Sequence, residues 1–387
     1  MGYQLKQGDM EQVFDRLTSG YDIYGPVRMK GEGMYSDTDV VRFGRIHTFE
    51  ELEWEVKSHY SFKEAVLPIT QILFYFTEHE MKEAEPERQK PAILFMRSCD
   101  IHAIKRLDQV YLNHGAEDYY YRRLRERVRL VLMGCAHTCE SGFCVSMGTN
   151  QTRDYDGAVN MVEAGDIQAG DIQGGEGIRW KLDSRWQALT EILESMKLPA
   201  QDVQPDYVRE NQVKVRVPEN CGPELTGHPV WKEYDSRCIA CGRCNFVCPT
   251  CTCFTMQDIF YQDNENAGER RRVHASCMVD GYSDVAGGGS CRKNNGERMR
   301  FKVLHKISDF KKKFGYQMCV GCGRCDDICP EYISFSACVN KLADMENVYS
   351  ISVCFFTFKI CDENGVYSCA CILPALLFHV SQLVHAG

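Results

Sequence analysis

Two runs of cysteine in this 387-residue chain share one spacing, and each ends in proline. The first reads CIACGRCNFVCP from Cys238, and the second reads CVGCGRCDDICP from Cys319. Both fit C-x2-C-x2-C-x3-C-P, and the Gly-Arg pair before the third cysteine is repeated as well. Thiolates at this spacing are typical ligands of a 4Fe–4S cube. The repeat therefore predicts two such clusters.

The proline after the last cysteine of each run ends the turn and separates that cysteine from the other three. In ferredoxins with two clusters, this fourth cysteine ligates the cluster of the other run. We therefore expect each cube to combine three cysteines of one run with one of the other. The first set is Cys238, Cys241, Cys244 and Cys329, and the second set is Cys319, Cys322, Cys325 and Cys248.

Structural zinc in a scaffold protein without a redox role is the alternative for these eight cysteines. Zinc sites commonly use two C-x2-C pairs for each ion, and two identical quartets with a trailing proline fit that pattern poorly. Other cysteines near the runs are expected to be small buried residues, because all eight corners are already filled. They are Cys251, Cys253, Cys277 and Cys291.

Four cysteines in the first half of the chain form a less regular set. They are Cys99, Cys135, Cys139 and Cys144. Apolar runs at 92–96 and 128–133 predict strands, and helical spacing at 101–112 predicts a crossover helix between them. Two parallel strands joined in this way would bring all four cysteines to the carboxyl edge of a sheet, where open α/β sheets bind ligands. This set admits a third 4Fe–4S cluster, and buried structural cysteines are the alternative.

Two polar residues beside Cys99 are candidates for the same site. Asp100 and His102 could hydrogen-bond the site or a docking partner. Asp100 could equally be the N-cap of the helix predicted to begin at Ile101.

The composition excludes several classes of protein. A net charge of −9 argues against nucleic-acid binding as the main role. The N-terminus lacks the apolar segment of a signal peptide, so we expect a cytoplasmic protein whose 22 cysteines are metal ligands more than disulfides. Neither G-x-G-x-x-G after a strand nor G-x-x-x-x-G-K-[ST] occurs, so no flavin or nucleotide site is predicted. Such a chain passes single electrons between other subunits.

These observations predict an α+β chain, with a mixed α/β N-terminal domain followed by an α-helical ferredoxin-like domain that binds two 4Fe–4S clusters. The expected segments are an α/β domain at 1–197, a linker at 198–226, the dicluster domain at 227–342 and an apolar tail at 343–387. Helices are expected at 186–196 and after each cysteine run, at 254–261 and 332–342.

Residues 286–300 are expected to form a flexible, basic loop between the two runs. Its basic residues could dock on an acidic partner surface, and a solvated loop is the alternative that we favour. They are Arg292, Lys293, Arg298 and Arg300.

Together these motifs resemble the A subunits of anaerobic sulfite reductases, a family related to the β subunits of cytoplasmic sulfhydrogenases. The resemblance covers residues 1 to about 342. It rests on SFKEAVLPITQILFYF, RSCDIHAIKRLDQVYL, TCESGFCVSMGT and the two cysteine runs. It implies an α-helical ferredoxin domain with a long insertion at 250–318. It also implies that Cys99, Cys135, Cys139 and Cys144 hold a further cluster.

The same resemblance implies an electron-transfer subunit whose catalytic site lies on another chain. A flavoprotein subunit would take electrons from NADH, and a sirohaem subunit would reduce sulfite to sulfide. A β subunit of a hydrogenase, or of another NAD-linked oxidoreductase, is the rival interpretation, because its wiring is the same and only the terminal acceptor differs.

The tail departs from this family, for which we expect a polar helical ending. Residues 343–387 are apolar, and no formal charge follows Gly365 when histidines are neutral. They contain Cys354, Cys361, Cys369 and Cys371. A membrane anchor is one interpretation. A non-native, loosely packed or disordered segment is the other, and we favour it because Pro374 and several polar residues interrupt the apolar run, so no membrane attachment is expected.

Overall fold

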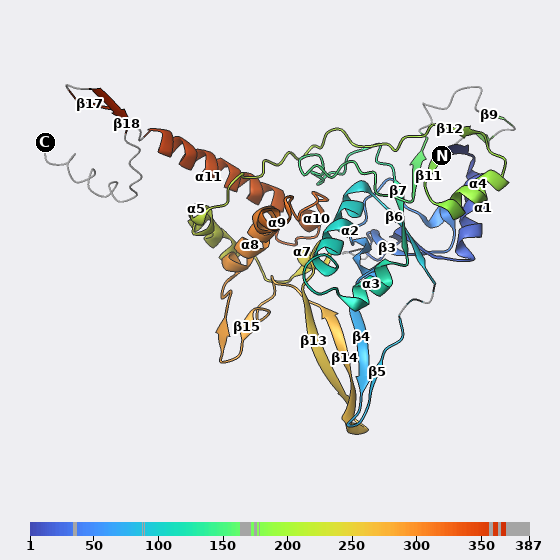
Figure 1. Ribbon diagram of the computed structural model, residues 1–387, viewed down its shortest axis with the longest axis horizontal. Helices are drawn as coiled ribbons and strands as arrows, with labels where there is room; N and C mark the ends of the chain where they lie inside the picture. Colours follow the sequence, from blue (N-terminus) through green and yellow to red (C-terminus); the bar gives the residue numbers. More distant parts are fainter. Residues whose placement is uncertain are drawn as a thin grey trace.

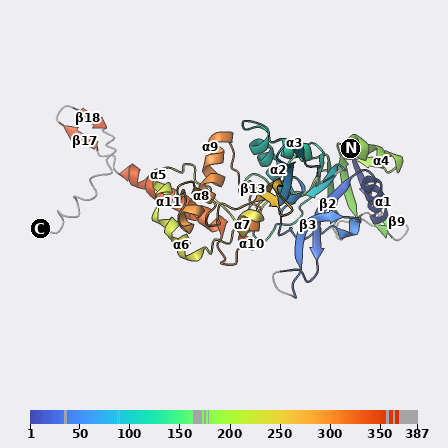
Figure 2. The ribbon, with the colours of Figure 1, turned by 90° about the horizontal axis from the view of Figure 1, so that it is seen from below.

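The computed structural model describes most of the chain. The described residues are 1–33, 37–86, 88, 90–162, 172–173, 176–177, 179–355, 359–362 and 365–368. An α/β part and a helical part lie beside each other, and a β-sheet arm extends from the region where they meet (Figure 1). The view from below shows the same two parts side by side (Figure 2).

The α/β part is built on an eight-stranded sheet of order β12-β1-β11-β8-β7-β6-β2-β3. Its strands are β1 (Gly2–Leu5), β2 (Asp22–Met29), β3 (Val40–Ile46), β6 (Ala92–Met96), β7 (Val128–Met133), β8 (Gly157–Met161), β11 (Trp180–Ser184) and β12 (Ala200–Gln201). The central strands β2, β6, β7 and β8 are parallel, and the flanking pairs are antiparallel. The prediction of parallel strands at 92–96 and 128–133 is confirmed.

Helices cover both faces of this sheet. On one face, α1 (Gln7–Thr18) and α4 (Gln187–Ser195) pack against side chains that include Ile93 and Phe95 of β6. On the other face, α2 (Ser98–Tyr111) and α3 (Tyr119–Arg125) pack against side chains that include Leu94 of β6. Because alternate residues of a strand point to opposite faces, β6 is buried on both sides. The helices predicted at 101–112 and 186–196 are confirmed.

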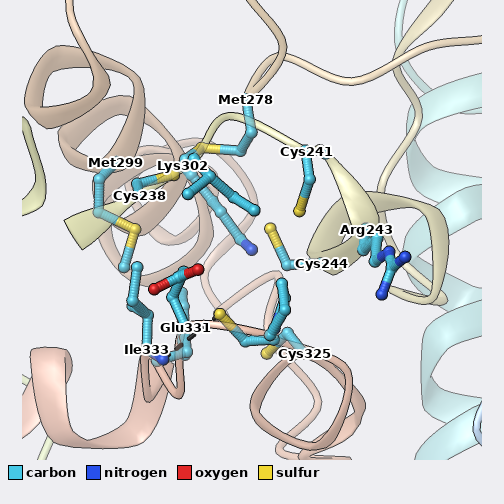
Figure 3. A pocket seen from close by; sticks show the side chains of 15 residues that line it. Cys238, Cys241, Arg243, Cys244, Met278, Met299, Lys302, Cys325, Glu331 and Ile333 are labelled. Atoms are coloured by element: carbon cyan, nitrogen blue, oxygen red, sulfur yellow. Dashed lines mark hydrogen bonds between the residues drawn. The ribbon is translucent and has the colours of Figure 1, made fainter. Parts of the chain in front are cut away.

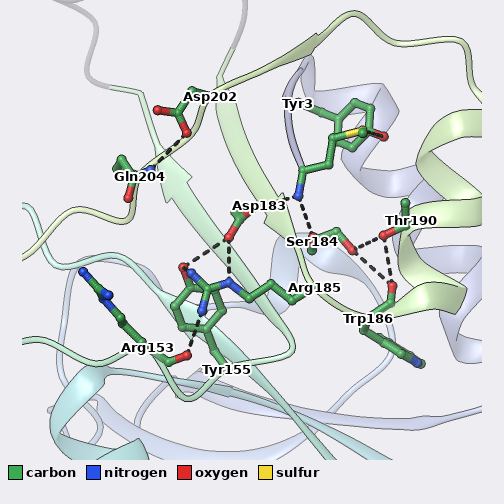
Figure 4. A network of polar contacts seen from close by, with 11 residues as sticks. Tyr3, Arg153, Tyr155, Asp183, Ser184, Arg185, Trp186, Thr190, Asp202 and Gln204 are labelled. Atoms are coloured by element: carbon green, nitrogen blue, oxygen red, sulfur yellow. Dashed lines mark hydrogen bonds and ion pairs between the residues drawn. The ribbon is translucent and has the colours of Figure 1, made fainter.

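The N-terminus is tied to strand β11 by a polar network (Figure 4). The Met1 amine donates to the Asp183 carboxylate at 3.1 Å and to the Ser184 carbonyl oxygen at 2.7 Å. The Asp183 carboxylate also accepts from the Tyr155 hydroxyl at 3.1 Å and from Arg185 at 3.2 Å. Burial, and then the nearby Asp183 charge, raise the pKa of Tyr155 to about 12. The network holds β1 in place beside β11.

The helical part begins inside the segment at 198–226, whose residues Ala200–Gln201 join the large sheet as β12 and whose last four residues form a short helix. Its helices are α5 (Pro223–Thr226), η5 (Pro229–Lys232), α6 (Glu233–Arg237), α7 (Arg243–Phe246), α8 (Asn295–Leu304), η6 (His305–Asp309), α9 (Phe310–Phe314), α10 (Arg324–Asp327) and α11 (Phe335–Phe355). Its core packs Trp231 and Tyr234 against Met299, Val303 and Phe335. The fold class predicted from the sequence, an α/β region followed by a ferredoxin-like domain, is confirmed.

A four-stranded antiparallel sheet forms the arm, in the order β13-β14-β4-β5. Its strands are β4 (Thr70–Phe76), β5 (Met81–Glu83), β13 (Phe254–Tyr261) and β14 (Asn264–His274). The prediction of a helix at 254–261 is therefore wrong. A short apolar run fits a helix and a strand equally well, and here the hairpin with β14, itself paired with β4, selects the strand. The insertion between the cysteine runs thus pairs with the N-terminal part of the chain.

The prediction of a loop at 286–300 is correct only in part. Strands β15 (Asp284–Val285) and β16 (Gly289–Ser290) pair, and α8 begins at Asn295 because the Asn294 side chain caps it by accepting from the Glu297 N–H at 2.9 Å. Arg298 is buried and pairs with Asp280 at 2.7 Å. The Arg298 side chain therefore stabilises the fold and is not available in solvent for docking.

The predicted tail begins inside a helix, because α11 continues from Phe335 through position 342 to Phe355. Beyond it, β17 (Lys359–Asp362) pairs with β18 (Gly365–Ser368), and residues 369–387, which include Cys369 and Cys371, lie outside the described residues. Within the part of the chain that the structure describes, no helix is both long enough and apolar enough to cross a bilayer.

Candidate functional site

One cavity, of about 40 Å³, is lined by the first cysteine run and by the end of the second run. Its cysteines are Cys238, Cys241, Cys244, Cys325 and Cys329. In Figure 3 the sulfur atoms of Cys238, Cys241 and Cys244 point toward a common centre, with Cys325 across from them. The structure therefore brings together the four residues expected to hold the first cube.

The second run lines a neighbouring cavity of about 20 Å³. Its cysteines are Cys248, Cys319, Cys322 and Cys325, which are the four expected to hold the second cube. Cys248 reaches this cavity from the first run, just as Cys329 reaches the first cavity from the second run. The exchange of the fourth cysteine, expected from the spacing, is compatible with this arrangement. Cys325 lines both cavities, so the two centres are neighbours.

The glycine that both runs place after the second cysteine is required by the backbone conformation at that position. Gly242 and Gly323 precede α7 and α10 with φ of 75° and 74°, in the left-handed region that favours glycine. A Cβ at Gly323 would lie 2.4 Å from the Ser141 carbonyl oxygen, so a larger residue would not fit. The turns also aim backbone N–H groups at sulfur, because Gly321 donates to the Cys319 Sγ at 3.4 Å. Such hydrogen bonds tune the potential of a cluster.

Two buried lysines line these cavities. Lys302 lines both, Lys306 lines the second, and the Lys306 ammonium donates to the Thr250 hydroxyl at 2.8 Å. Burial opposes the charge of Lys306, but the thiolates of Cys248 and its neighbours outweigh that effect and raise its pKa. Buried cations of this kind offset the negative charge that four thiolates bring to a site.

Replacing Lys302 with methionine is expected to lower the midpoint potentials of the first and second clusters. A unit charge about 8 Å away at an effective dielectric constant near 20 contributes on the order of 100 mV. Redox titration followed by electron paramagnetic resonance measures this shift. Lys312→Met, at an exposed position on α9, is the control and should leave both potentials unchanged. Equal potentials in the two variants would contradict the prediction.

The four cysteines of the first domain also line one cavity, of about 20 Å³, at the carboxyl ends of β6 and β7. They are Cys99, Cys135, Cys139 and Cys144. Arg97 lies 3.5 Å from the Cys135 sulfur, and the Cys144 thiol lies 3.6 Å from the Asn211 amide oxygen. Burial raises the pKa of the Cys144 thiol to about 11, although its hydrogen bond to Asn211 acts in the opposite direction.

Sequence reasoning missed Asn211, which lies in the segment expected to be a linker. Its side chain is buried, accepts from the Val145 N–H at 2.8 Å and donates to the Thr138 hydroxyl at 2.9 Å. The amide thus holds the loop that carries Cys139 and Cys144 in place. An isolated asparagine in a stretch rich in Pro, Gly and Asn gave no signal for this role.

The alternative that Asp100 is the N-cap of α2 is wrong, because Arg97 occupies that position. The Asp100 carboxylate instead accepts from Arg324 Nη1 at 2.6 Å and Nη2 at 2.9 Å. Both side chains are almost fully buried, at 1% exposed for Arg324 and 4% for Asp100. This bidentate pair joins the third cavity to the second cysteine run. His102 lies beside it, with Nε2 2.7 Å from the Gln151 carbonyl oxygen.

The remaining cysteines of the dicluster region do not line any of the three thiol cavities among the described residues. Cys251 and Cys277 are buried, as expected, and Asn245 donates to the Cys277 sulfur at 3.1 Å. Cys291 is exposed, so the expectation that it is buried is wrong. It directly follows β16, the second strand of the β15–β16 hairpin.

A single zinc ion and a 4Fe–4S cube require different distances between the sulfur ligands. Among the residues that the structure describes, no three Cys, His, Asp or Glu side chains are close enough to share one metal ion. Tetrahedral zinc at about 2.3 Å from each sulfur would require sulfurs roughly 3.8 Å apart. A cube holds its ligands farther apart, because iron and sulfide lie between them. The two cysteine runs, each followed by proline, match the spacing typical of 4Fe–4S ligands and fit the paired C-x2-C pattern of zinc sites poorly.

Comparison with known proteins agrees with this geometry. Residues 237–333, which contain both cysteine runs, match the family described as a 4Fe-4S dicluster domain. This part of the chain is a 4Fe-4S dicluster domain. It accounts for two 4Fe–4S clusters, as the sequence predicted.

The similarity to one curated protein extends over most of the chain. Sulfhydrogenase 2 subunit beta from Pyrococcus furiosus is 29% identical over 325 residues, which cover 83% of the chain and 92% of that protein. No solved structure matches the chain. The chain is thus an iron–sulfur electron-transfer protein, distantly homologous to a sulfhydrogenase β subunit.

Proposed function

We propose that the chain is the electron-transfer subunit of an anaerobic, cytoplasmic sulfite reductase complex. In this role it relays electrons from a flavoprotein subunit that oxidises NADH to a sirohaem subunit that reduces sulfite to sulfide. 4Fe–4S clusters pass one electron at a time. The sulfite assignment rests on the sequence motifs, and the electron-transfer role rests on the arrangement of the thiol cavities.

A row of three adjoining thiol cavities is the observation that supports this role most strongly. Cys325 lines the first and second cavities, and Cys322 lines the second and third. One cysteine thus separates each cavity from the next. We assign Cys238, Cys241, Cys244 and Cys329 to the first cluster, Cys319, Cys322, Cys325 and Cys248 to the second, and Cys99, Cys135, Cys139 and Cys144 to a third.

Contacts between the two parts of the chain support a fixed route through this row. The Lys57 ammonium donates to the Cys322 carbonyl oxygen at 2.7 Å and pairs with Asp327 at 2.8 Å. The Phe143 N–H donates to the Gly321 carbonyl oxygen at 2.7 Å. Residues of the third cavity therefore pack directly on the second run, which keeps the distance between these centres constant.

The first cavity is the end of the row that lies nearest the surface. Cys241 is exposed, and Ile239 beside it is 57% exposed. Tyr332, shortly after Cys329, is 86% exposed. A partner that docks here would approach the first cluster closely, so we place one of the two electron-exchange contacts at this face.

Replacing Cys139 with serine is expected to remove the third cluster and to leave the other two. The iron content should fall from about twelve to about eight per chain, with sulfide in the same ratio. The resonance of the dicluster domain should persist, because its eight cysteines are unchanged. Cys291→Ser, at an exposed cysteine outside the three thiol cavities, is the matched control and should keep about twelve irons. A Cys139→Ser protein with the iron content of this control would exclude Cys139 as a ligand.

A β subunit of a cytoplasmic hydrogenase is the second candidate, favoured by the Pyrococcus furiosus relative. The clusters of this chain would transfer electrons in the same way in either complex, so the test must identify the cofactor of the terminal subunit. Anaerobic purification of the native complex, followed by absorbance spectroscopy and metal analysis, separates the two. Sirohaem absorbance without nickel supports the sulfite reductase, and nickel without sirohaem would replace it with the hydrogenase.

A further inference from the structure

A fourth cavity, without cysteine, lies where β3, η2 (Phe62–Ala65), the base of the arm and α7 meet. Its volume is about 230 Å³, far larger than the thiol cavities. At about 30 Å³ for one water, it has room for a small polyatomic group with some hydration.

The cavity collects positive charge in a chain whose net charge is −9. Arg42, Lys63 and Arg243 line it, and Glu64 contributes the only carboxylate to that lining. His274 is also in the wall, and burial, followed by the nearby charge of Lys63, lowers its pKa to about 4. His274 is neutral at pH 7 and adds no charge, so Arg42 and Arg243 supply the positive charge that exceeds the one carboxylate of Glu64.

The internal repeat places an arginine at the same position of each C-G-R-C turn, and the two arginines differ in their partners. Arg243 and Arg324 follow Gly242 and Gly323, whose φ and ψ angles agree within a few degrees. Arg324 holds the Asp100 carboxylate with two hydrogen bonds. Its counterpart Arg243 is exposed, and within the described residues it has no carboxylate or hydrogen-bond partner. Figure 3 shows the Arg243 side chain pointing away from the thiols.

The two other cations of the cavity differ in whether they can bind an anion. The Arg42 guanidinium lies 4.2 Å from the centre of the Tyr60 ring, and no ion-pair partner for it occurs among the described residues. The buried Lys63 ammonium already donates to the carbonyl oxygens of Cys248 and Cys251, at 3.2 and 3.3 Å. Burial lowers the pKa of Lys63, whose hydrogen bonds are already used inside the fold, so the two guanidinium groups are the donors available to an anion.

We propose that this cavity binds an anionic oxygen group, a carboxylate or a small oxyanion, through Arg243 and Arg42. Charge-assisted bonds from a guanidinium fork are suited to such groups. The group comes either from solution or from an acidic side chain of a partner subunit. The inference uses the dicluster domain and is independent of which acceptor the complex reduces.

The position of the cavity couples such an anion to both clusters of the dicluster domain. Val247 and Ile328 are part of the wall, and each directly precedes one of the exchanged cysteines, Cys248 and Cys329. Negative charge placed here disfavours the added electron, so occupancy lowers the midpoint potentials of these clusters.

Calorimetric titration of the intact, cluster-loaded chain with sulfate, and separately with malonate, tests the proposal at constant ionic strength. We expect saturable binding that is at least tenfold weaker in Arg243→Gln and in Arg42→Gln. Arg129→Gln, at an exposed arginine on β7 paired with Asp156, is the control and should bind like the unaltered chain. Unchanged cluster resonances in each variant would show that the proteins are folded.

The same titration of the assembled complex separates the two sources. A partner carboxylate in the cavity would prevent sulfate from binding the complex, and Arg243→Gln would then dissociate the complex at lower salt. A site for a free oxyanion would bind sulfate equally in the chain and in the complex. Absence of saturable binding to the isolated chain, or equal affinities for Arg243→Gln and Arg129→Gln, would overturn the proposal whatever the cluster count.

Discussion

Cys329→Ser is expected to lose or damage the first cluster, although the other three ligands of that cluster lie 85 to 91 residues earlier in the chain. Cys329 lines the cavity of Cys238, Cys241 and Cys244, and not the cavity of its own run. The second cluster should remain, because Cys248 completes its set. Iron and sulfide analysis with electron paramagnetic resonance of the reduced protein would show one cluster missing or altered.

The reciprocal variant makes this prediction specific. Cys248→Ser should damage the second cluster and spare the first, so the two variants should lose different resonances. Cys291→Ser should lose neither. Loss of the second cluster in Cys329→Ser would mean that each run holds its own cube, and an unaffected spectrum would exclude Cys329 as a ligand.

Arg324→Leu is expected to destabilise the whole molecule, because it leaves the buried Asp100 carboxylate without a partner. Removing one member of a buried ion pair typically costs about 3–5 kcal/mol. Arg324 also donates to the Ser58 carbonyl oxygen at 2.8 Å, so a further buried acceptor would be left unsatisfied. Anaerobic thermal unfolding, followed by circular dichroism and cluster absorbance, should show a midpoint lower by several degrees.

The repeat provides the matched control for this variant. Arg243→Leu makes the same change at the equivalent position, where the side chain is exposed, and should alter stability by about 0.5 kcal/mol or less. The double variant Asp100→Leu with Arg324→Leu should recover part of the loss, since no buried charge remains. Equal destabilisation by Arg324→Leu and Arg243→Leu would show that the ion pair contributes little.

Strong local patterns predicted much of this fold. The β6-α2-β7 unit follows from two apolar runs and the helical spacing between them, and the structure places the ends of these elements within three residues of the prediction. The two clusters follow from cysteine spacing alone, because the ligands are close in sequence and a proline marks each end. The edge of the sheet then indicated where four irregularly spaced cysteines would meet.

Contacts between distant segments could not be predicted in this way. The arm depends on pairing of β14 with β4, which no pattern within residues 254–261 reveals. Asp100 has the residue type and position of a helix cap, and only its meeting with Arg324 gives it another role. Asn211 likewise supports the third cavity from a segment whose composition is typical of a linker.

The third thiol cavity and its place in the row can be tested by one measurement on the anaerobically purified chain. Iron and acid-labile sulfide should each be present at about twelve per chain, and the reduced protein should show magnetic interaction among three 4Fe–4S clusters. The interaction should simplify when Cys248→Ser perturbs the middle cluster. About eight irons, with a spectrum of two clusters only, would contradict the three-centre route.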